Sequence, residues 1–469
     1  MNDSIFREYD IRGIVERELT EGFAYKLGRA FALYVKRQTP HPVALSVGRD
    51  VRTSSDYLAK GLIDGMLTEG VHVYNLGVCP TPLQYFSLFV LDVQGGVMIT
   101  GSHNPPEYNG FKLSLGKTTL HGDAIQEIKA ILEGLDGSLK ARKGEITDVD
   151  IIERYRSYML ERFSYLDSPE YRRLKVVVDP GNGTAGLVIP EILESIGCDV
   201  VRLYCEPDGR FPNHHPDPTV VENIQDLIER TLSTGADIGV GYDGDADRIG
   251  IVDSTGEIIW GDQIMIILSR EILKRHRGAT IIGDVKCSQT LFNDIIKNGG
   301  NPVMWKTGHS LVKDKMRKEG AILAGELSGH IFIADDYFGY DDALYTTLRI
   351  VEIMKTTGKS IKALLTGIPE MFSTPEIRLD CPETKKKAVV QRVLERFRTY
   401  HKNSDSPYPV LEIQDIDGVR ALFERGWALL RSSNTQPVVV MRVEAEDEES
   451  LSGYRRFMED EFLKAMEEL

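Results

Sequence analysis

Short apolar runs alternate with stretches of helical periodicity along most of the chain, and this alternation constrains the fold more than any other feature. Strands are predicted at residues 43–47, 71–76 and 96–100, with helices over 54–69 and 82–91 between them. The same alternation recurs, with strands at 175–178, 200–204 and 238–242 and again at 280–284, 302–306 and 321–324. Alternating strands and helices are typical of sheets covered by helices, so we expect three similar α/β units in succession.

The pattern changes in the last part of the chain. A charged helix is predicted over 385–400, strands at 427–430 and 438–443, and an acidic helix from Glu448. A polar segment at 139–150 and a turn at 253–256 indicate earlier boundaries. We therefore predict an α/β fold of three consecutive similar domains and a smaller C-terminal α+β domain, divided as 1–150, 151–254, 255–368 and 369–469.

The net charge and the cysteine content limit the partners and the cellular compartment that this protein can have. The formal net charge of −15 disfavours a general nucleic-acid or anionic-membrane surface, and no stretch approaches the roughly 18 apolar residues of a membrane span. The five cysteines form no C-x-x-C pair, and their odd number gives no closed disulfide framework. The N-terminus lacks a basic region followed by an apolar one. We therefore predict a cytoplasmic protein with no nucleic-acid or membrane partner.

A serine stands in the turn-rich segment Thr-Gly-Ser-His-Asn-Pro-Pro-Glu-Tyr-Asn-Gly-Phe-Lys, residues 100–112. Gly101, Asn104, Pro105 and Pro106 favour a loop, so the Ser102 hydroxyl is expected at an exposed loop tip, where it is available for chemistry. Turns use these same residues, so this motif alone leaves a plain turn open.

A second motif, Asp243-Gly-Asp-Ala-Asp-Arg248, follows the apolar run 238–242. The three alternating aspartates are expected to direct their carboxylate oxygens to one point, and such hard oxygen ligands are the type that Mg2+ prefers. Arg248 adds a fixed cation that can fork onto a phosphate. A calcium loop does not fit, because the position that needs Gly after the third acid is Arg248 and the twelfth position, normally Glu, is Ser254.

A competing motif is Gly181-Asn-Gly-Thr-Ala-Gly186, which follows a predicted strand and fits the dinucleotide fingerprint G-x-G-x-x-G. Glu206 lies about 20 residues further on, where a ribose would need an acid. Taken alone, this motif indicates a nicotinamide enzyme. A second match at 239–244 is followed by a strand pattern in place of a helix and is weak.

Five blocks of the chain together resemble the α-D-phosphohexomutase superfamily, and most closely the phosphomannomutase/phosphoglucomutase enzymes. The blocks are Phe6-Arg-Glu-Tyr-Asp-Ile-Arg-Gly13, residues 100–112, residues 243–248, Gly325-Glu-Leu-Ser-Gly-His330 and Arg431-Ser-Ser-Asn-Thr-Gln-Pro437. They span nearly the whole chain in the family's order, which chance does not explain. This outweighs the dinucleotide motif, so residues 181–186 are interpreted as a structural turn between strand and helix.

The resemblance implies a phosphoserine at Ser102 and Mg2+ bound by the serine phosphate with Asp243, Asp245 and Asp247. Arg248 would support the same phosphate. His330 is expected to act as acid and base, with Lys112 and Arg12 as electrostatic partners, because histidine titrates near neutral pH.

The resemblance also implies substrate contacts. Glu326 and Ser328 would bind sugar hydroxyls, with Glu326 on the 3- and 4-hydroxyls. Arg431, Ser433, Asn434 and Thr435 would hold the phosphate that is not transferred. Tyr9, Lys286 and His309 would line the same cleft, which all four domains must form because Arg431 lies far from Ser102 in sequence. The family's usual Phe-Asp-Asp-Gly is here Tyr340-Asp-Asp-Ala343.

The implied activity is interconversion of hexose 6-phosphate and hexose 1-phosphate, of mannose or glucose, through a hexose 1,6-bisphosphate. Glucose 1,6-bisphosphate is the expected activator and hexose phosphates are the expected partners. The protein is expected to be a monomer or a weak dimer. A phosphoglucosamine mutase and a non-catalytic sugar-phosphate-binding protein remain the alternatives.

Overall fold

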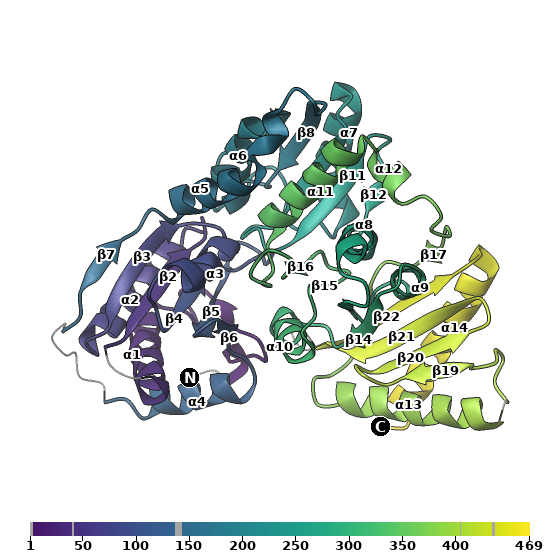
Figure 1. The fold of residues 1–469 in the computed structure, drawn as a ribbon. Helices are drawn as coiled ribbons and strands as arrows, with labels where there is room; N and C mark the ends of the chain where they lie inside the picture. The colour runs from purple at the N-terminus through teal and green to yellow at the C-terminus, as the bar shows by residue number, and fades with distance from the viewer. Residues whose placement is uncertain (1–2, 40–41, 137–142, 404, 434–436) are drawn as a thin grey trace.

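The computed structural model describes residues 3–39, 42–136, 143–403, 405–433 and 437–469. Four β-sheets follow one another along the chain, and Figure 1 shows the C-terminal sheet, in yellow, beside the third unit and on the opposite side of the view from the first. Among the described residues, no helix is long and apolar enough to cross a membrane.

The first sheet has the order β1-β5-β4-β2-β3-β7, with β6 beside β5. Its strands are β1 (Ile11–Ile14), β2 (Ala44–Arg49), β3 (His72–Val78), β4 (Gly95–Ile99), β5 (Tyr108–Leu115), β6 (Thr118–Thr119) and β7 (Ile146–Asp148). The helices α1 (Glu21–Gln38), α2 (Ser55–Thr68) and α4 (Asp123–Glu133) share one apolar core with it. Helix α3 (Thr81–Val90) instead belongs to a core shared with the following domains.

The second sheet has the order β12-β11-β10-β8-β9, and the third β14-β13-β15-β16. Their strands are β8 (Leu174–Asp179), β9 (Cys198–Arg202), β10 (Ile238–Tyr242), β11 (Ile249–Asp253), β12 (Ile258–Ile259), β13 (Thr280–Asp284), β14 (Asn301–Trp305), β15 (Leu323–Gly325) and β16 (Ile331–Ile333). The α-helices in this region are α5 (Ile151–Phe163), α6 (Ile189–Ser195), α7 (Gln225–Thr234), α8 (Gly261–Arg275), α9 (Gln289–Lys297), α10 (His309–Glu319), α11 (Ala343–Thr357) and α12 (Ile361–Leu364). The described 3-10 helices are η1 (Asp3–Ile5), η2 (Ser164–Asp167), η3 (Thr184–Leu187) and η4 (Val221–Ile224).

The three sheets share one arrangement. Three parallel strands are joined by an antiparallel fourth, as β3-β2-β4-β5, β9-β8-β10-β11 and β14-β13-β15-β16. This confirms the predicted succession of three similar α/β domains with mixed sheets. The predicted strands are present, close to their predicted bounds. The predicted domain boundaries stay a prediction, and the β11–β12 hairpin extends the second sheet to Ile259.

The C-terminal sheet is wholly antiparallel in its described pairings and has the order β17-β22-β21-β20-β19, with β18 beside β22. The strands are β17 (Phe372–Ser373), β18 (Ile377–Asp380), β19 (Glu412–Gln414), β20 (Val419–Phe423), β21 (Gly426–Ser432) and β22 (Val438–Ala445), and the helices are α13 (Lys386–Asn403) and α14 (Glu448–Glu467). The helices and the sheet enclose a core of their own. The predicted α+β domain is confirmed.

The domains differ in how much apolar core they share with one another. One continuous core runs from α3 through the second and third domains, so these parts pack as one body. The C-terminal domain contacts the third domain through a small cluster of Val285, Trp427 and Leu429. Beside this cluster the fully buried Arg420 lies over the Trp427 ring, with its guanidinium carbon 4.0 Å from the ring centroid. The C-terminal domain is therefore docked by a far smaller apolar contact than those that join the other three.

Candidate active site

Three equivalent loops meet at one cavity. Each connects the third parallel strand of a domain to its antiparallel neighbour: β4 to β5 with Ser102, β10 to β11 with 243–248, and β15 to β16 with 326–330. They line a cavity of about 760 Å³ together with the C-terminal domain. The predicted site residues that line it are Tyr9, Arg12, Ser102, Lys112, Asp247, Arg248, Lys286, His309, Glu326, Ser328, His330, Arg431 and Ser433. Asn434 and Thr435 lie outside the described residues.

The serine loop differs from its prediction in one respect. Ser102 was expected at an exposed loop tip, and that is wrong, because its relative exposure is only 3%. The cause is the buried Arg52, whose guanidinium donates hydrogen bonds to the carbonyls of Ser102 (2.8 Å), Asn104 (2.5 Å), Pro105 (2.7 Å) and Tyr108 (3.0 Å). One cation thus draws the whole loop onto the first domain, and the serine lines the cavity wall without protruding.

The Ser102 hydroxyl lies against the acidic loop. Its Oγ donates to Asp243 Oδ2 at 2.7 Å and lies 3.1 Å from His103 Nδ1. The two loops touch through their backbones, since a Cβ on Gly244 would lie 2.6 Å from the Ser102 carbonyl oxygen. Only glycine fits there. The backbone of the acidic loop therefore fixes the position of the serine.

The three aspartates form a pocket suited to a divalent cation. All are fully buried, and one oxygen from each lies within 4.8 Å of the others. Lys112 donates to Asp245 Oδ2 at 2.8 Å and also to Asp247, yet Asp245 Oδ1 has no hydrogen-bond partner among the residues that the structure describes. Burial raises the pKa of Asp243 well above its ordinary value, and the neighbouring carboxylates raise it further. A buried oxygen without a partner and mutually repelling carboxylates fit a hard cation such as Mg2+.

Residues 181–186 form part of the connection between β8 and the following helices, as their interpretation as a structural turn predicts, and they also contact the aspartate pocket. Thr184 donates to the Gly244 carbonyl from its backbone nitrogen at 3.1 Å and from its hydroxyl at 3.2 Å. After β8 the chain forms the 3-10 helix η3 and then the short α6. Gly183 brings the backbone against the acidic loop, since a Cβ there would lie 2.7 Å from the Gly244 carbonyl oxygen.

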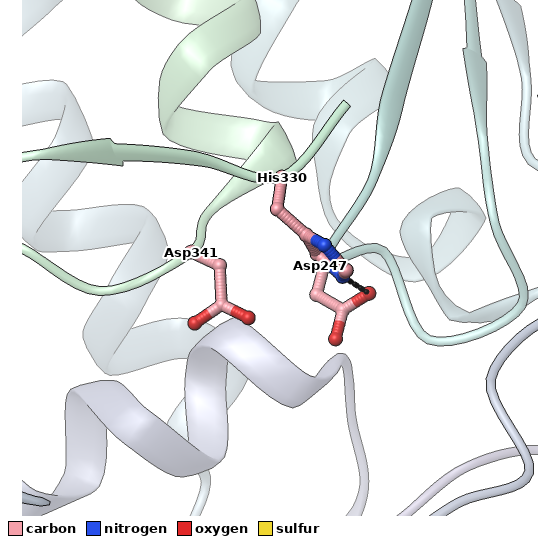
Figure 2. A group of neighbouring side chains, drawn as sticks. All are labelled: Asp247, His330 and Asp341. Atoms are coloured by element: carbon pink, nitrogen blue, oxygen red, sulfur yellow. Dashed lines mark ion pairs between the residues drawn. The ribbon is translucent and has the colours of Figure 1, made fainter. Parts of the chain in front are cut away.

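A second cluster joins Asp247 and His330 to Asp341, as Figure 2 shows, with the His330 ring directed at Asp247. His330 Nε2 lies 3.3 Å from Asp247 Oδ1. Lys313 Nζ binds Asp341 at 2.9 Å, and Lys112 binds Asp247. Asp247 belongs to both clusters, but here its neighbours are an imidazole and a single further carboxylate, whereas the three aspartates offer only the carboxylate oxygens that Mg2+ prefers.

His330 is held between acids and a guanidinium. Its Nδ1 lies 2.6 Å from Glu326 Oε2, and its Nε2 accepts from Arg248 Nε at 3.3 Å. Burial lowers the pKa of His330, but Asp247 and Glu326 outweigh this and raise it to about 9. The protonated ring can donate to Asp247 and the neutral ring can accept from Arg248, so both protonation states have a partner.

Glu326 is almost fully buried as a carboxylate. Its Oε1 accepts from the Gly308 backbone nitrogen at 2.5 Å, and its Oε2 accepts from Ser328 at 3.3 Å in addition to His330. Burial raises its pKa, yet His330 and Lys286 lower it to about 2. The group is therefore a pure hydrogen-bond acceptor on the cavity wall, which suits recognition of hydroxyl groups.

The far side of the cavity carries cations from the third and fourth domains. Lys286 Nζ binds Glu376 at 2.6 Å, and Arg431 Nε binds Asp417 Oδ2 at 2.8 Å. The same Asp417 oxygen accepts from the Thr307 backbone nitrogen at 3.2 Å. The Thr307 carbonyl in turn accepts from the Tyr9 hydroxyl at 3.0 Å. One chain of hydrogen bonds therefore links the first, third and fourth domains at the cavity.

The segment that departs from the family pattern keeps both of its acids. Asp342 caps α11 by accepting from the Tyr345 backbone nitrogen at 2.8 Å, and Ala343 begins the helix. Asp341 binds Lys313. Alanine fits at this position because the backbone there is already helical.

Sequence reasoning missed several residues that shape the site. They are Asp50, Arg52, Thr81, Glu376 and Asp417. Asp50 accepts from the Gly101 nitrogen at 3.1 Å, and Thr81 donates to Asp245 Oδ2 at 2.5 Å. Asp50 and Arg52 directly follow the buried strand β2, and charged residues at that position were an available signal. The other three stand in no motif.

Comparison with known proteins agrees with this geometry. The chain matches the four domain models of the phosphoglucomutase/phosphomannomutase family in order. These are alpha/beta/alpha domain I over residues 3–137, domain II over 153–256, domain III over 260–372 and the C-terminal domain over 376–461. A phosphomannomutase/phosphoglucomutase of Pseudomonas syringae pv. tomato is 42% identical over 467 residues, covering 100% of this chain and 97% of that protein. A phosphoglucomutase of Neisseria gonorrhoeae is 40% identical, covering 95% of this chain and 94% of that protein.

A solved structure is similar over nearly the same length. The crystal structure of a phosphoglucomutase/phosphomannomutase family protein from Burkholderia thailandensis superposes with a TM-score of 0.89 at 38% identity, covering 99% of this chain and 98% of that one. The fold and the site define an intramolecular phosphotransferase, a hexose-phosphate mutase. The chain belongs to the phosphoglucomutase/phosphomannomutase family.

The Arg52 contacts generate a prediction about the serine loop. Arg52→Met removes the donor to four loop carbonyls, so we expect a loss of roughly 3 kcal/mol of unfolding free energy and faster backbone hydrogen exchange over residues 100–108. Denaturant titration and exchange mass spectrometry measure both. The control is Arg49→Met, whose ion-pair partner Asp56 is 77% exposed and whose cost should stay within about 1 kcal/mol. Equal stability and exchange in the two variants would contradict the role of Arg52.

Proposed function

We propose that the protein interconverts hexose 6-phosphate and hexose 1-phosphate, of mannose and glucose, through a phosphoserine at Ser102 and a hexose 1,6-bisphosphate. The contact between Ser102 Oγ and Asp243 carries the proposal, because it places a nucleophilic hydroxyl on an aspartate pocket that fits a cation. Phosphoryl transfer depends mainly on in-line placement and on neutralisation of charge. Both requirements are served by buried groups at this position.

The transfer step is assigned to groups around Ser102. A sugar hydroxyl oxygen attacks the phosphorus of phosphoserine, the bond from phosphorus to Ser102 Oγ breaks, and the sugar gains the phosphoryl group. The hydroxyl gives up one proton, and Ser102 Oγ takes up one. We assign the proton-accepting and proton-donating role to His330, and the stabilisation of phosphate charge to Arg12, Lys112 and Arg248. The second half reaction reverses these steps with the other phosphate of the bisphosphate.

Asp243, Asp245 and Asp247, with an oxygen of the phosphoserine, would hold Mg2+. When bound, the ion supplies positive charge against the phosphate oxygens. Glucose 1,6-bisphosphate is proposed as the activator, because its transfer of one phosphoryl group to Ser102 would restore enzyme that has lost its phosphate.

Substrate recognition is assigned to the other walls of the cavity. Glu326 is proposed to accept hydrogen bonds from the 3- and 4-hydroxyls, which glucose and mannose share because these sugars differ at C2. Ser328 is proposed to bind the sugar beside Glu326. Arg431 and Ser433 would hold the phosphate that is not transferred, with Asn434 and Thr435 beyond the described residues. Tyr9, Lys286 and His309 would complete the wall.

We further propose that the protein works in the cytoplasm as a monomer or weak dimer, with hexose phosphates as its partners and no nucleic-acid or membrane partner. All five cysteines are free thiols, which supports a reducing compartment. Burial raises the pKa of Cys79 to about 12 and that of Cys205 to about 12, which keeps these thiols protonated and unreactive.

A coupled assay tests the proposal directly. With Mg2+ and a trace of glucose 1,6-bisphosphate, we expect turnover of mannose 1-phosphate and glucose 1-phosphate and little turnover of glucosamine 1-phosphate. Ser102→Ala should lose at least roughly a thousandfold in kcat, since the covalent route is removed. The control is Ser114→Ala, which removes a buried hydroxyl that has no hydrogen-bond partner in the described part of the chain and should stay active.

Turnover of glucosamine 1-phosphate alone would favour the phosphoglucosamine mutase. Binding of all three sugars without turnover would favour the non-catalytic binding protein. Robust turnover by Ser102→Ala would exclude the covalent route.

The aspartate pocket generates a separate prediction. Asp245→Asn removes one negative charge at nearly constant shape, so Mg2+ should bind at least roughly tenfold more weakly, a change of about 1.4 kcal/mol. Calorimetric titration of Mg2+ and the Mg2+ dependence of turnover measure this. The matched control Asp56→Asn changes a carboxylate that is 77% exposed and should leave both unchanged. An unaltered Mg2+ affinity in Asp245→Asn would place the metal elsewhere.

A further inference from the structure

The cations on the far side of the cavity are already paired. Lys286 holds Glu376 at 2.6 Å, and Arg431 holds Asp417 at 2.8 Å. Arg442 donates to the Lys286 carbonyl and lies 4.0 Å from Asp262. Each of these three side chains therefore faces a carboxylate, and together they bring little net positive charge to a phosphate. A phosphate monoester carries close to two negative charges near neutral pH.

Arg378 is the exception on this side of the cavity. It is exposed, it lines the same cavity, and within the described ranges its guanidinium makes no hydrogen bond or ion pair. It stands on β18, immediately after the segment that carries Glu376. The sequence gives no motif at this position, which is why it was not among the predicted site residues.

The strand register places Arg378 beside Arg431. Arg378 is directly opposite Val440 on β22, and Val440 is directly opposite Arg431 on β21. Residues directly opposite one another point to the same face of a sheet. The two arginines therefore flank Val440 in one row, about 10 Å apart at the backbone because two strand spacings separate them. All three residues line the cavity.

Three cations of this region all affect the carboxylate of Glu376. Lys286 lowers its pKa most, against the opposing effect of burial, and Arg431 and Arg378 lower it further, to about 2. Three cations thus surround one carboxylate on the cavity wall. An anion that approaches the cavity wall at Val440 meets Arg431 on one side and Arg378 on the other.

We infer that Arg378 is a second arginine of the phosphate site on the C-terminal domain, binding together with Arg431 the phosphate of a hexose phosphate or bisphosphate that faces away from Ser102. The inference rests on the proposed function and names a binding residue that neither the five sequence blocks nor their resemblance assigns. Arg378 supplies the unpaired positive charge that its paired neighbours lack. Two nitrogens of its guanidinium group can each donate a hydrogen bond to a phosphate oxygen, as a fork. The bisphosphate, with the larger negative charge, should depend on it most.

Direct binding to an inactive background tests this without turnover. In the Ser102→Ala protein, calorimetric titration with glucose 1,6-bisphosphate should give a Kd roughly tenfold higher when Arg378→Ala is added, the loss expected for a charge-assisted hydrogen bond. Arg378→Lys should recover part of this loss, because it keeps the charge without the fork. The control Arg425→Ala removes an arginine that is 54% exposed and paired with Glu446 and Asp447. It should bind as the parent does.

Turnover gives a second readout. With Ser102 intact, Arg378→Ala should raise KM for glucose 1-phosphate severalfold, release more bisphosphate into solution, and leave kcat nearly unchanged with the activator in excess. In the titration, a bisphosphate Kd for Arg378→Ala equal to that for Arg425→Ala would overturn the inference. A wild-type protein that binds the bisphosphate through Arg378 yet shows no mutase activity would overturn the proposed function while leaving this inference intact.

Discussion

The burial of three aspartates in one turn is the constraint on which the rest of the site depends. Asp243, Asp245 and Asp247 are fully buried, and the first domain supplies both the Lys112 ammonium group and the Ser102 hydroxyl that pair with them. Like charges can be buried only when partners are held in place, so the turn requires the first and second domains to stay packed. The backbone is strained at the same contact, with positive φ at Ser102 (49°) and Ala246 (61°). Folding and chemistry thus rely on one set of contacts.

A loop that recurs at the same place in three domains explains how one cavity contains three different sets of functional groups. In each of the first three domains the loop between the third parallel strand and its antiparallel neighbour points to the same centre, and the loops carry the serine, the aspartates and the Glu326–His330 pair. The C-terminal domain adds arginines from an antiparallel sheet with a core of its own. Its small apolar contact with the third domain suits a domain that can move, as the proposed use of both phosphates of a bisphosphate at Ser102 would require.

The fold and most of the site were predictable because their signals are local. Strand and helix periodicity located the three parallel strands at the centre of each α/β domain, and in the C-terminal domain both helices and the strands β21 and β22. Ser102, the three aspartates and His330 stand in compact motifs. The burial of Ser102 was not predictable, because Arg52 acts from another loop some 50 residues earlier. Asp417 and Arg378 matter only through contacts and strand register in the folded chain, which no motif records. Long-range partners of this kind are set by tertiary packing, and a single sequence does not display them.

The proposed function depends on direct passage of a phosphoryl group from Ser102 to the sugar. A single-turnover experiment measures this most directly: enzyme carrying a radiolabelled phosphate on Ser102 is mixed with excess unlabelled glucose 1-phosphate and Mg2+, and the products are separated after rapid quenching. We expect the label to leave the protein at the rate of turnover and to appear first in glucose 1,6-bisphosphate and then in glucose 6-phosphate. Label that stays on the protein during turnover, or that appears only as inorganic phosphate, would contradict direct transfer to the sugar.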